Sequence, residues 1–315
     1  MKTLLEIADI LKSKNCIYIL THRYPDGDTL GSAYALCRAL QLIGKKCKVL
    51  CHDEIPSKFR FMNDYVKYEE FDPEYIISTD VADIKLLGDK LSIYSDKINM
   101  CIDHHMSNKS YADITFVDAM SAATAEIIYE LIQSLGIPTD EEIATCLYVG
   151  ISTDTGCFKH SNTTAKTHKI AYELINKNIN LSKINSELFE KKSKETLSVE
   201  YMVYNTLEYF FKGKCAVIRL TQNMLNSVGI NDNELEGIAS IPRQIDGVKI
   251  GITIREKKPN LFKISVRTTE DINAIEICEA FGGGGHPRTG GCTIEGELEE
   301  VKEKLLSVIK NKYGW

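Results

Sequence analysis

The chain has 315 residues, of which 43% are hydrophobic and 26% charged, and its formal net charge is −6. This composition excludes a disordered chain, a collagen-like repeat and a small disulfide scaffold. The negative charge argues against binding along long nucleic acid, which requires a basic face. The length suggests about two domains.

The N-terminal residues and the cysteines both indicate a cytoplasmic protein. Residues 1–15 place Glu6, Asp9 and lysines around an apolar stripe, which is typical of a surface helix rather than a secretory signal. No apolar run approaches the roughly 20 residues that cross a bilayer. The ten cysteines form no CxxC pair, which favours reduced thiols. Cys47 and Cys51 could bind a metal together with His52, but buried core thiols are the favoured interpretation.

The first half of the chain alternates short apolar runs with helical patterns. Strands are predicted at residues 16–20, 46–51, 75–78, 98–102 and 113–117, and the clearest helices at 29–43 and 122–135. Strands that alternate with helices indicate crossover connections and a mostly parallel sheet in an α/β fold. Because most of these strands are almost continuously apolar, we expect both faces of the sheet to be covered.

The polar segment 186–200 is predicted to be an exposed helix or a linker, with domains at 1–185 and 201–315 and a cleft between them. The second half predicts strands at 214–220, 248–255 and 261–268, and helices near 234–240, 272–281 and 298–310. Residues 248–268 indicate a hairpin that turns at 258–260. This pattern is typical of a smaller α+β domain. It contains five of the eight arginines, which favours an anion site.

Four clusters of acidic and histidine residues each follow an apolar segment. The clusters are His22 with Asp26 and Asp28, Asp80 with Asp83, Asp103 with His104 and His105, and Asp154 alone. Each cluster by itself also fits turns and helix caps, such as a turn at 25–27 and a cap at Asp28. Together, two of these imidazoles and four of these carboxylates at one edge of a parallel sheet fit a pair of divalent cations. The absence of cysteine from these positions disfavours structural zinc.

Four consecutive glycines precede His286, at Gly282, Gly283, Gly284 and Gly285. A flexible hinge or a helix C-cap after Phe281 would explain such a run without any function. The functional interpretation is a loop whose backbone N–H groups close on a phosphate or a ribose, with His286 as an added donor.

The motif order HxxxDxD, a lone Asp, DHH and TDTG resembles the DHH phosphoesterase superfamily. The stretch KISVRT, followed by FGGGGHPRTGG, resembles the DHHA1 substrate domain of that superfamily. Together, over essentially the whole chain, the two are similar to the stand-alone oligoribonuclease/pAp phosphatase type, also called the nanoRNase type. The resemblance implies an N-terminal DHH catalytic domain and a C-terminal DHHA1 domain.

The resemblance also implies a pair of Mn²⁺ ions, with Mg²⁺ or Co²⁺ as substitutes. It assigns the first ion to His22, Asp26 and Asp80. It assigns the second ion to Asp28, Asp80, His104 and Asp154, so that Asp80 bridges both. The catalytic residues would be Asp80, His105 facing the substrate, and Asp103 orienting the neighbouring histidine.

The DHHA1-like half supplies the substrate-binding residues that the resemblance implies. These are Arg267, Gly282, Gly283, Gly284, Gly285, His286 and Arg288. The family commonly has a basic residue and then alanines after the histidine, whereas this chain has Pro287, Arg288 and Thr289. The departure leaves the fine substrate preference open.

The expected activity is hydrolysis of RNA of roughly two to five nucleotides to mononucleotides, or of pAp to AMP. One alternative is a phosphodiesterase for pApA or cyclic di-AMP. A pyrophosphatase is disfavoured by the GGGGH pattern, and a nucleotide-binding module without catalysis is disfavoured by the intact candidate ligands. We expect short RNA or nucleotide partners and neither membrane nor long nucleic acid. A homodimer is left open.

Overall fold

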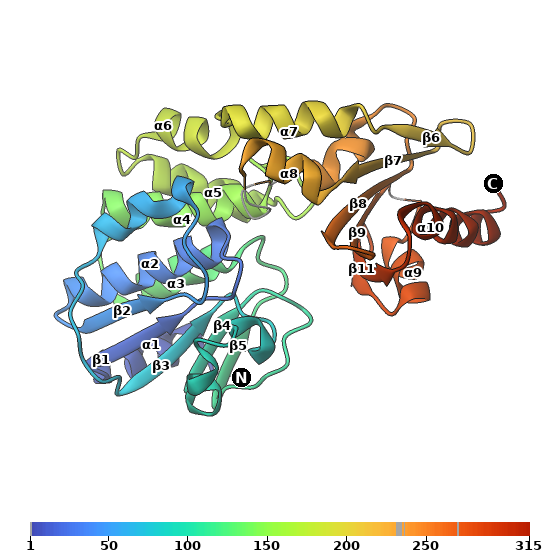
Figure 1. The fold of residues 1–315 in the computed structure, drawn as a ribbon. Coiled ribbons are helices and arrows are strands. Elements are labelled where there is room, and N and C mark those ends of the chain that lie inside the picture. Colours follow the sequence, from blue (N-terminus) through green and yellow to red (C-terminus); the bar gives the residue numbers. More distant parts are fainter. Residues whose placement is uncertain (1, 231–234, 236, 270) are drawn as a thin grey trace. The chain divides into compact units, whose positions relative to one another are not determined.

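A computed structural model describes residues 2–230, 235, 237–269 and 271–315 of the chain. The chain divides into two compact units, Met1–Lys191 and Lys192–Trp315 (Figure 1). The division lies within the segment 186–200 that was predicted as an exposed helix or linker. Here Ser186–Glu190 form a π-helical turn and α7 spans Lys194–Tyr204. The helix predicted near 234–240 lies partly outside the described residues, and Ile238–Gln244 form the 3₁₀ segment η6.

Sheet A, in the first unit, has five strands that are all parallel, as predicted. The strands are β1 (Cys16–Leu20), β2 (Lys46–Leu50), β3 (Tyr75–Thr79), β4 (Met100–Asp103) and β5 (Ile114–Val117). Their spatial order is β2-β1-β3-β4-β5. The direction of winding therefore reverses between β1 and β3, and in open α/β sheets ligands bind at the carboxyl ends of strands at such a switch point.

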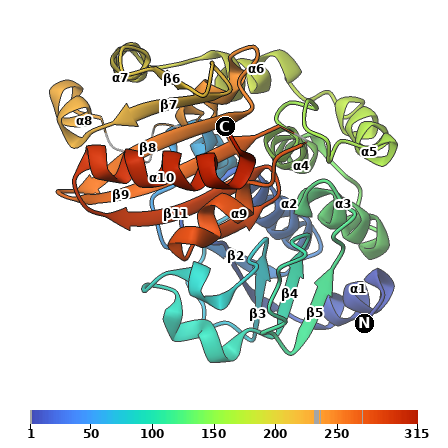
Figure 2. The ribbon, with the colours of Figure 1, turned by 90° about the vertical axis from the view of Figure 1, so that its right-hand side faces the viewer.

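Both faces of sheet A are buried, which explains its almost continuously apolar strands. The helices of this unit are α1 (Leu4–Ser13), α2 (Gly27–Leu42), α3 (Thr124–Leu135), α4 (Glu141–Asp154), α5 (Ala165–Ile175) and α6 (Leu181–Asn185). Ile17, Ile19 and Ile77 share a core with α2, α3 and α4, whereas Tyr18 and Leu20 pack in a separate core with residues of the 3₁₀ segment η2 (Ile84–Leu87). Figure 2 shows α2 and α3 on one side of the sheet.

The remaining segments of the first unit are 3₁₀ turns. They are η1 (Ser57–Tyr65) and η3 (Ser92–Lys97). No helix within the described residues combines the length and the apolar composition that a membrane span requires.

Sheet B, in the second unit, has six strands in the order β10-β11-β9-β8-β7-β6. They are β6 (Glu208–Phe210), β7 (Cys215–Leu220), β8 (Ile250–Lys258), β9 (Leu261–Thr268), β10 (Gly284–His286) and β11 (Thr289–Glu295). Only β7 and β8 are parallel neighbours, and the β8–β9 hairpin confirms the turn predicted at 258–260. Residues of α7 and α8 (Gln222–Val228) pack in one core, and residues of α9 (Ala274–Cys278) and α10 (Leu298–Tyr313) in another.

The four glycines at 282–285 were predicted as a loop, but only the first two lie outside a strand. Gly284 to His286 form the short edge strand β10, which pairs with β11 across a turn at Pro287 and Arg288. Gly282 has a left-handed backbone (φ 69°) and ends the 3₁₀ turn η7 (Glu279–Phe281), so the C-cap interpretation is right for this glycine. The pairing with β11 was not evident because glycine has low strand propensity.

Candidate metal centre

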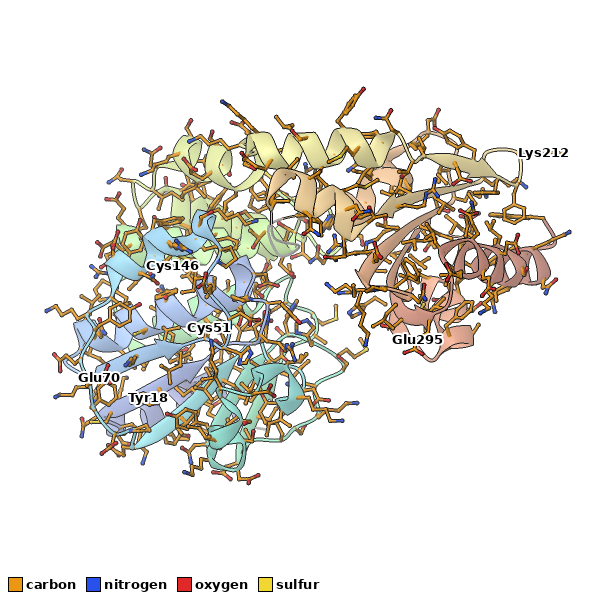
Figure 3. All side chains as sticks on the ribbon, in the orientation of Figure 1. Tyr18, Cys51, Glu70, Cys146, Lys212 and Glu295 are labelled. Carbon is orange, nitrogen blue, oxygen red and sulfur yellow. The ribbon has the colours of Figure 1, made fainter. Side chains whose placement is uncertain are left out.

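The histidine and acidic clusters of the first unit meet at the carboxyl-end edge of sheet A. His22 follows β1, Asp80 follows β3, and Asp103 is the last residue of β4. Asp154 differs from these because it ends helix α4 rather than a strand. Cys51, labelled in Figure 3, follows β2, and its thiol donates to the His22 carbonyl at 3.8 Å. The site therefore lies at the switch point between β1 and β3.

The first group of candidate ligands consists of His22, Asp26 and Asp80. The Nε2 atom of His22 lies 3.6 Å from a carboxylate oxygen of Asp26 and 3.6 Å from Oδ2 of Asp80. Its Nδ1 atom is 2.7 Å from the Arg23 carbonyl. A proton on Nδ1 donates to this carbonyl, which leaves the Nε2 lone pair directed at the carboxylates and available to a metal.

The second group consists of Asp28, His104 and Asp154, and a third group that shares His104 with it consists of Asp80, His104 and His105. The Nε2 atom of His104 lies 3.9 Å from Asp28 and 3.7 Å from Asp154. Its Nδ1 atom is 3.2 Å from the Ser121 carbonyl, which favours the same tautomer as in His22. Ser121 was not singled out in the sequence because a main-chain carbonyl leaves no signal in the residue type.

Asp80 connects the two groups through its two carboxylate oxygens. Oδ2 faces His22, while Oδ1 lies 3.7 Å from Nε2 of His104. The backbone of Asp80 is left-handed (φ 61°), and its N–H donates to the Ile102 carbonyl at 2.9 Å. A left-handed backbone is costly for a non-glycine residue and is concentrated at functional sites. The geometry thus suits a carboxylate shared by two cations.

The electrostatics of the site fit added positive charge. Burial opposes protonation of His22, but Asp26 and Asp80 outweigh burial and raise the pKa of His22 to about 11, so a cation that binds Nε2 must displace a proton from it. Burial, together with Asp80 and Asp154, raises the pKa of Asp28 well above its ordinary value. Carboxylates crowded in a buried site resist ionisation unless cations compensate them. Because the donors are oxygen and imidazole nitrogen, the residues fit two divalent cations of the Mn²⁺ or Mg²⁺ type.

Asp103 fixes His105 through a set of short hydrogen bonds. Its buried carboxylate accepts from the main-chain N–H groups of His104 and His105 at 2.8 and 3.1 Å. It also accepts from Nδ1 of His105 at 2.8 Å and from the side chain of Asn108 at 2.6 Å. Burial opposes protonation of His105, but Asp103 and Asp80 raise the pKa of His105 to about 9. The sequence analysis did not predict a role for Asn108, because its hydrogen bond to Asp103 depends on the conformation of the loop after β4.

The alternative in which Asp28 caps α2 is contradicted by the structure. Asp26 is the N-cap residue, and it accepts from the N–H groups of Asp28 and Thr29. The Asp28 carboxylate instead accepts from the N–H groups of Thr124 and Ala125 at 2.7 and 2.9 Å, at the start of α3. The Ala123 side chain provides no N-cap hydrogen bond, so the Asp28 carboxylate serves the first N–H groups of α3 in place of a cap.

In the second unit, the candidate substrate residues lie on three adjacent strands. Arg267 of β9 is paired with Thr289 of β11, and Thr289 is paired with His286 of β10. The half-buried Arg267 guanidinium donates to the Val266 carbonyl at 3.1 Å, and burial lowers its pKa. His286 and Arg288 are exposed. Their roles remain predictions.

Comparison with known proteins identifies two family domains. Residues 16–151 match the N-terminal domain of the DHH family, and residues 213–313 match the DHHA1 domain. The chain is 29% identical to the bifunctional oligoribonuclease and PAP phosphatase NrnA of Thermus thermophilus over 97% of this chain and 93% of that protein. It is 27% identical to the Bacillus subtilis protein of the same name, over 93% of each chain.

A more distant relative and two solved structures extend the comparison. The cyclic-di-AMP phosphodiesterase PdeA of Listeria monocytogenes is 22% identical over 96% of this chain and 48% of that protein. The crystal structure of an exopolyphosphatase-related protein from Bacteroides fragilis has a TM-score of 0.87, with 24% identity over 98% and 95% of the two chains. The RecJ–Mn²⁺ complex of Thermus thermophilus has a TM-score of 0.61, with 14% identity over 98% and 54%.

Proposed function

Because the chain belongs to the DHH/DHHA1 phosphoesterase family, we propose that it is a Mn²⁺-dependent hydrolase of very short oligoribonucleotides and of pAp. The products would be mononucleotides and AMP. The observation that carries the proposal is the position of Asp80, whose two oxygens face two separate groups of histidine and carboxylate donors at the switch point of sheet A. The NrnA relatives support the substrate class.

The proposed first metal position uses His22, Asp26 and Asp80, and the second uses Asp28, Asp80, His104 and Asp154. When bound, a metal pair of this kind activates water and stabilises negative charge on the phosphoryl group. Manganese is the proposed metal because the donors are oxygen and imidazole and because the neighbouring RecJ structure contains Mn²⁺. The shared carboxylate would hold the two positions at a fixed separation.

His105 is the proposed donor to the phosphate. Nδ1 of His105 lies 2.8 Å from the Asp103 carboxylate, and this pairing favours the protonated imidazole. The remaining N–H, on Nε2, is then available to a phosphoryl oxygen, where it would stabilise the charge that develops in the transition state. Asp103 positions this donor and does not itself contact the substrate.

The second unit is the proposed binding region for the rest of the nucleotide. The Arg267 guanidinium can make two parallel hydrogen bonds to a phosphate, and it lies in register with Thr289 and His286. The exposed edge strand β10 adds main-chain N–H groups from its glycines. Two such anchors suffice for a short ligand, whereas a chain of net charge −6 is poorly suited to hold many phosphates against salt.

A second candidate function is hydrolysis of pApA or cyclic di-AMP. The relative PdeA favours it, because the similarity spans almost all of this chain. The same metal positions and the same phosphate anchors would serve both substrate classes. The difference would lie in how the second nucleotide is bound.

Product analysis with the purified full-length chain tests the proposal. The substrates are pAp, pApA, cyclic di-AMP and RNA of two to twenty-four nucleotides, each with added Mn²⁺ and with chelator. We expect kcat/KM to be highest for dinucleotides and to fall steeply with length. A flat or rising profile would contradict the short-substrate proposal, and full activity in chelator would contradict metal dependence. Faster turnover of cyclic di-AMP than of every other substrate would favour the second candidate.

A further inference from the structure

Thr124, the first residue of α3, contacts two candidate metal ligands through two different groups. Its main-chain N–H donates to Oδ2 of Asp28 at 2.7 Å, and its hydroxyl donates to Oδ1 of Asp80 at 2.9 Å. The exposed fractions of Thr124, Asp28 and Asp80 are 0, 2 and 3%, so water does not substitute for these bonds. We propose that Thr124 is a positioning residue that fixes the Asp80 carboxylate between the two metal positions, an inference that rests on the proposed function.

Asp80 needs an external constraint because its terminal torsion is soft. Rotation about the Cβ–Cγ bond of an aspartate has broad, roughly two-fold minima. To be shared, the carboxylate must keep Oδ2 toward His22 at 3.6 Å and Oδ1 toward His104 at 3.7 Å. Among the described residues, two groups outside the assigned metal ligands face Oδ1 of Asp80. The Thr124 hydroxyl donates to it at 2.9 Å, and Nδ1 of His105 lies 3.4 Å from it. Because Nδ1 of His105 is bonded to Asp103 at 2.8 Å, the Thr124 hydroxyl is the closer constraint on where Oδ1 points.

The Thr124 side chain is itself held in place by the helix that it begins. The twelve-residue helix α3 has no side-chain cap at Ala123, and Asp28 accepts from the first N–H groups of the helix, those of Thr124 and Ala125. Threonine is branched at Cβ, which restricts the torsion that aims its hydroxyl. One helix end thus holds Asp28 through the main chain and Asp80 through a side chain.

Because the main chain of Thr124 bonds to Asp28 and its side chain bonds to Asp80, a side-chain substitution can remove the Asp80 bond alone. Thr124→Val replaces the hydroxyl by a methyl group of similar size, so it removes the bond to Asp80 and keeps the main-chain bond to Asp28. Thr124→Ala repeats the removal with a smaller side chain, in case the valine does not fold. Thr124→Ser restores a hydroxyl. The full-length chain is titrated with MnCl₂ alone and followed by calorimetry and by electron paramagnetic resonance, which distinguishes a coupled Mn²⁺ pair from isolated ions.

We expect the wild type and Thr124→Ser to bind two ions with a coupled signal. We expect Thr124→Val and Thr124→Ala to bind one of the two ions about 10-fold to 100-fold more weakly and to lose the coupling, as is typical when a partner of a metal ligand is removed. The melting temperature of the metal-free variants is measured in parallel.

The matched control is Thr29→Val. Thr29 is equally buried, and its hydroxyl bond of 3.0 Å ends on the Thr79 carbonyl rather than on a carboxylate. If both Thr124→Val and Thr124→Ala keep the wild-type Mn²⁺ affinity and the coupled signal, the positioning role is wrong. The role is also wrong if Thr29→Val loses as much Mn²⁺ affinity and coupling as Thr124→Val does. If the wild type itself binds no coupled pair, the proposed metal pair is wrong, and this result is distinct from either of those.

Discussion

The edge of sheet A that carries the candidate metal ligands and the β9–β11–β10 region of sheet B expose their candidate residues to different degrees. Asp28, Asp80 and Asp103 are at most 3% exposed, and each accepts hydrogen bonds from neighbouring groups. In contrast, Gly285 and His286 lie exposed on an edge strand. If the proposed roles are right, the groups proposed to react are fixed before substrate arrives, whereas those proposed for recognition complete their bonding with the ligand. Substitutions in the first unit should therefore lower kcat, and those in the second should raise KM.

The largest expected effect is that of Asp80→Ala. Both metal positions lose their shared carboxylate, so we expect turnover to fall by about 10³-fold or more, together with the loss of stoichiometric Mn²⁺ binding. Asp83→Ala is the matched control, because Asp83 accepts from the Lys85 N–H as a local cap and belongs to neither ligand group. If Asp80→Ala bound both ions and kept wild-type turnover, the assignment of Asp80 as the shared ligand would be wrong.

His105→Ala should have the next largest effect. Removal of one charge-stabilising donor typically costs about 10²-fold in kcat, and because His105 is assigned to neither metal we expect Mn²⁺ stoichiometry to remain that of the wild type. Steady-state kinetics and calorimetry measure the two quantities separately. An effect confined to KM would place His105 with the recognition groups and not with the reacting ones.

Arg267→Ala tests the opposite half of the comparison. We expect KM for a dinucleotide to rise about 10-fold with little change in kcat, since a charge-assisted phosphate contact of about 1.4 kcal/mol corresponds to this factor. A generic aryl phosphodiester without a second phosphate should be hydrolysed at the wild-type rate. Arg219→Ala is the control, because Arg219 is ion-paired with Glu208 and Glu299. An equal loss on both substrates would contradict the division of roles.

Gly284→Ala should have a smaller effect that sharpens the same comparison. A Cβ atom at Gly284 would meet nothing within 4 Å, whereas one at Gly283 would lie 2.2 Å from the Gly291 carbonyl oxygen. The fold therefore tolerates Gly284→Ala, and a KM increase of about two-fold to five-fold would indicate that substrate approaches this backbone. An unchanged KM would exclude Gly284 from the proposed recognition groups.

The smallest expected effect concerns the stability of the metal-free protein. Burial, reinforced by Asp80 and Asp26 and opposed by His104, raises the pKa of Asp154 to about 6. Because an unfolded aspartate titrates near 3.9, this group lowers the free energy of unfolding as pH rises from about 4 to 6. Asp154→Asn cannot ionise and therefore avoids this loss of stability. In chelator, its melting temperature should exceed that of the wild type by a few degrees above pH 6, and the difference should be smaller at pH 4. Excess Mn²⁺ should reverse the order.

The strands of the first unit, and the edge at which its candidate metal ligands lie, could be predicted because local sequence determines them. The five residues of β1 are almost all buried, and a run that is apolar on both faces gives a clear boundary at Leu20. His22, Asp80 and His104 come together because parallel strands end at a common edge. Each of these residues is placed by its own strand, so no long-range information is needed to find them.

The contacts that orient the ligands could not be predicted in this way. The Thr124 hydroxyl bonds to a carboxylate 44 residues away, and Asp28 bonds to main-chain groups 96 and 97 residues away. Such pairings depend on how α2 and α3 pack, and the residue types alone also fit an ordinary helix start. Strand β10 was missed for a related reason, since its pairing depends on the register of β11.

The left-handed backbone of Asp80 has a consequence for protein engineering and for evolution. Glycine adopts φ near 61° without strain, so Asp80→Gly relieves the backbone strain, but it also leaves the buried Thr124 hydroxyl without its acceptor. The melting temperature of Asp80→Gly in chelator measures which of these two effects is larger. Stability and hydrolysis thus place different demands on this position, as is expected where a strained residue serves a proposed site.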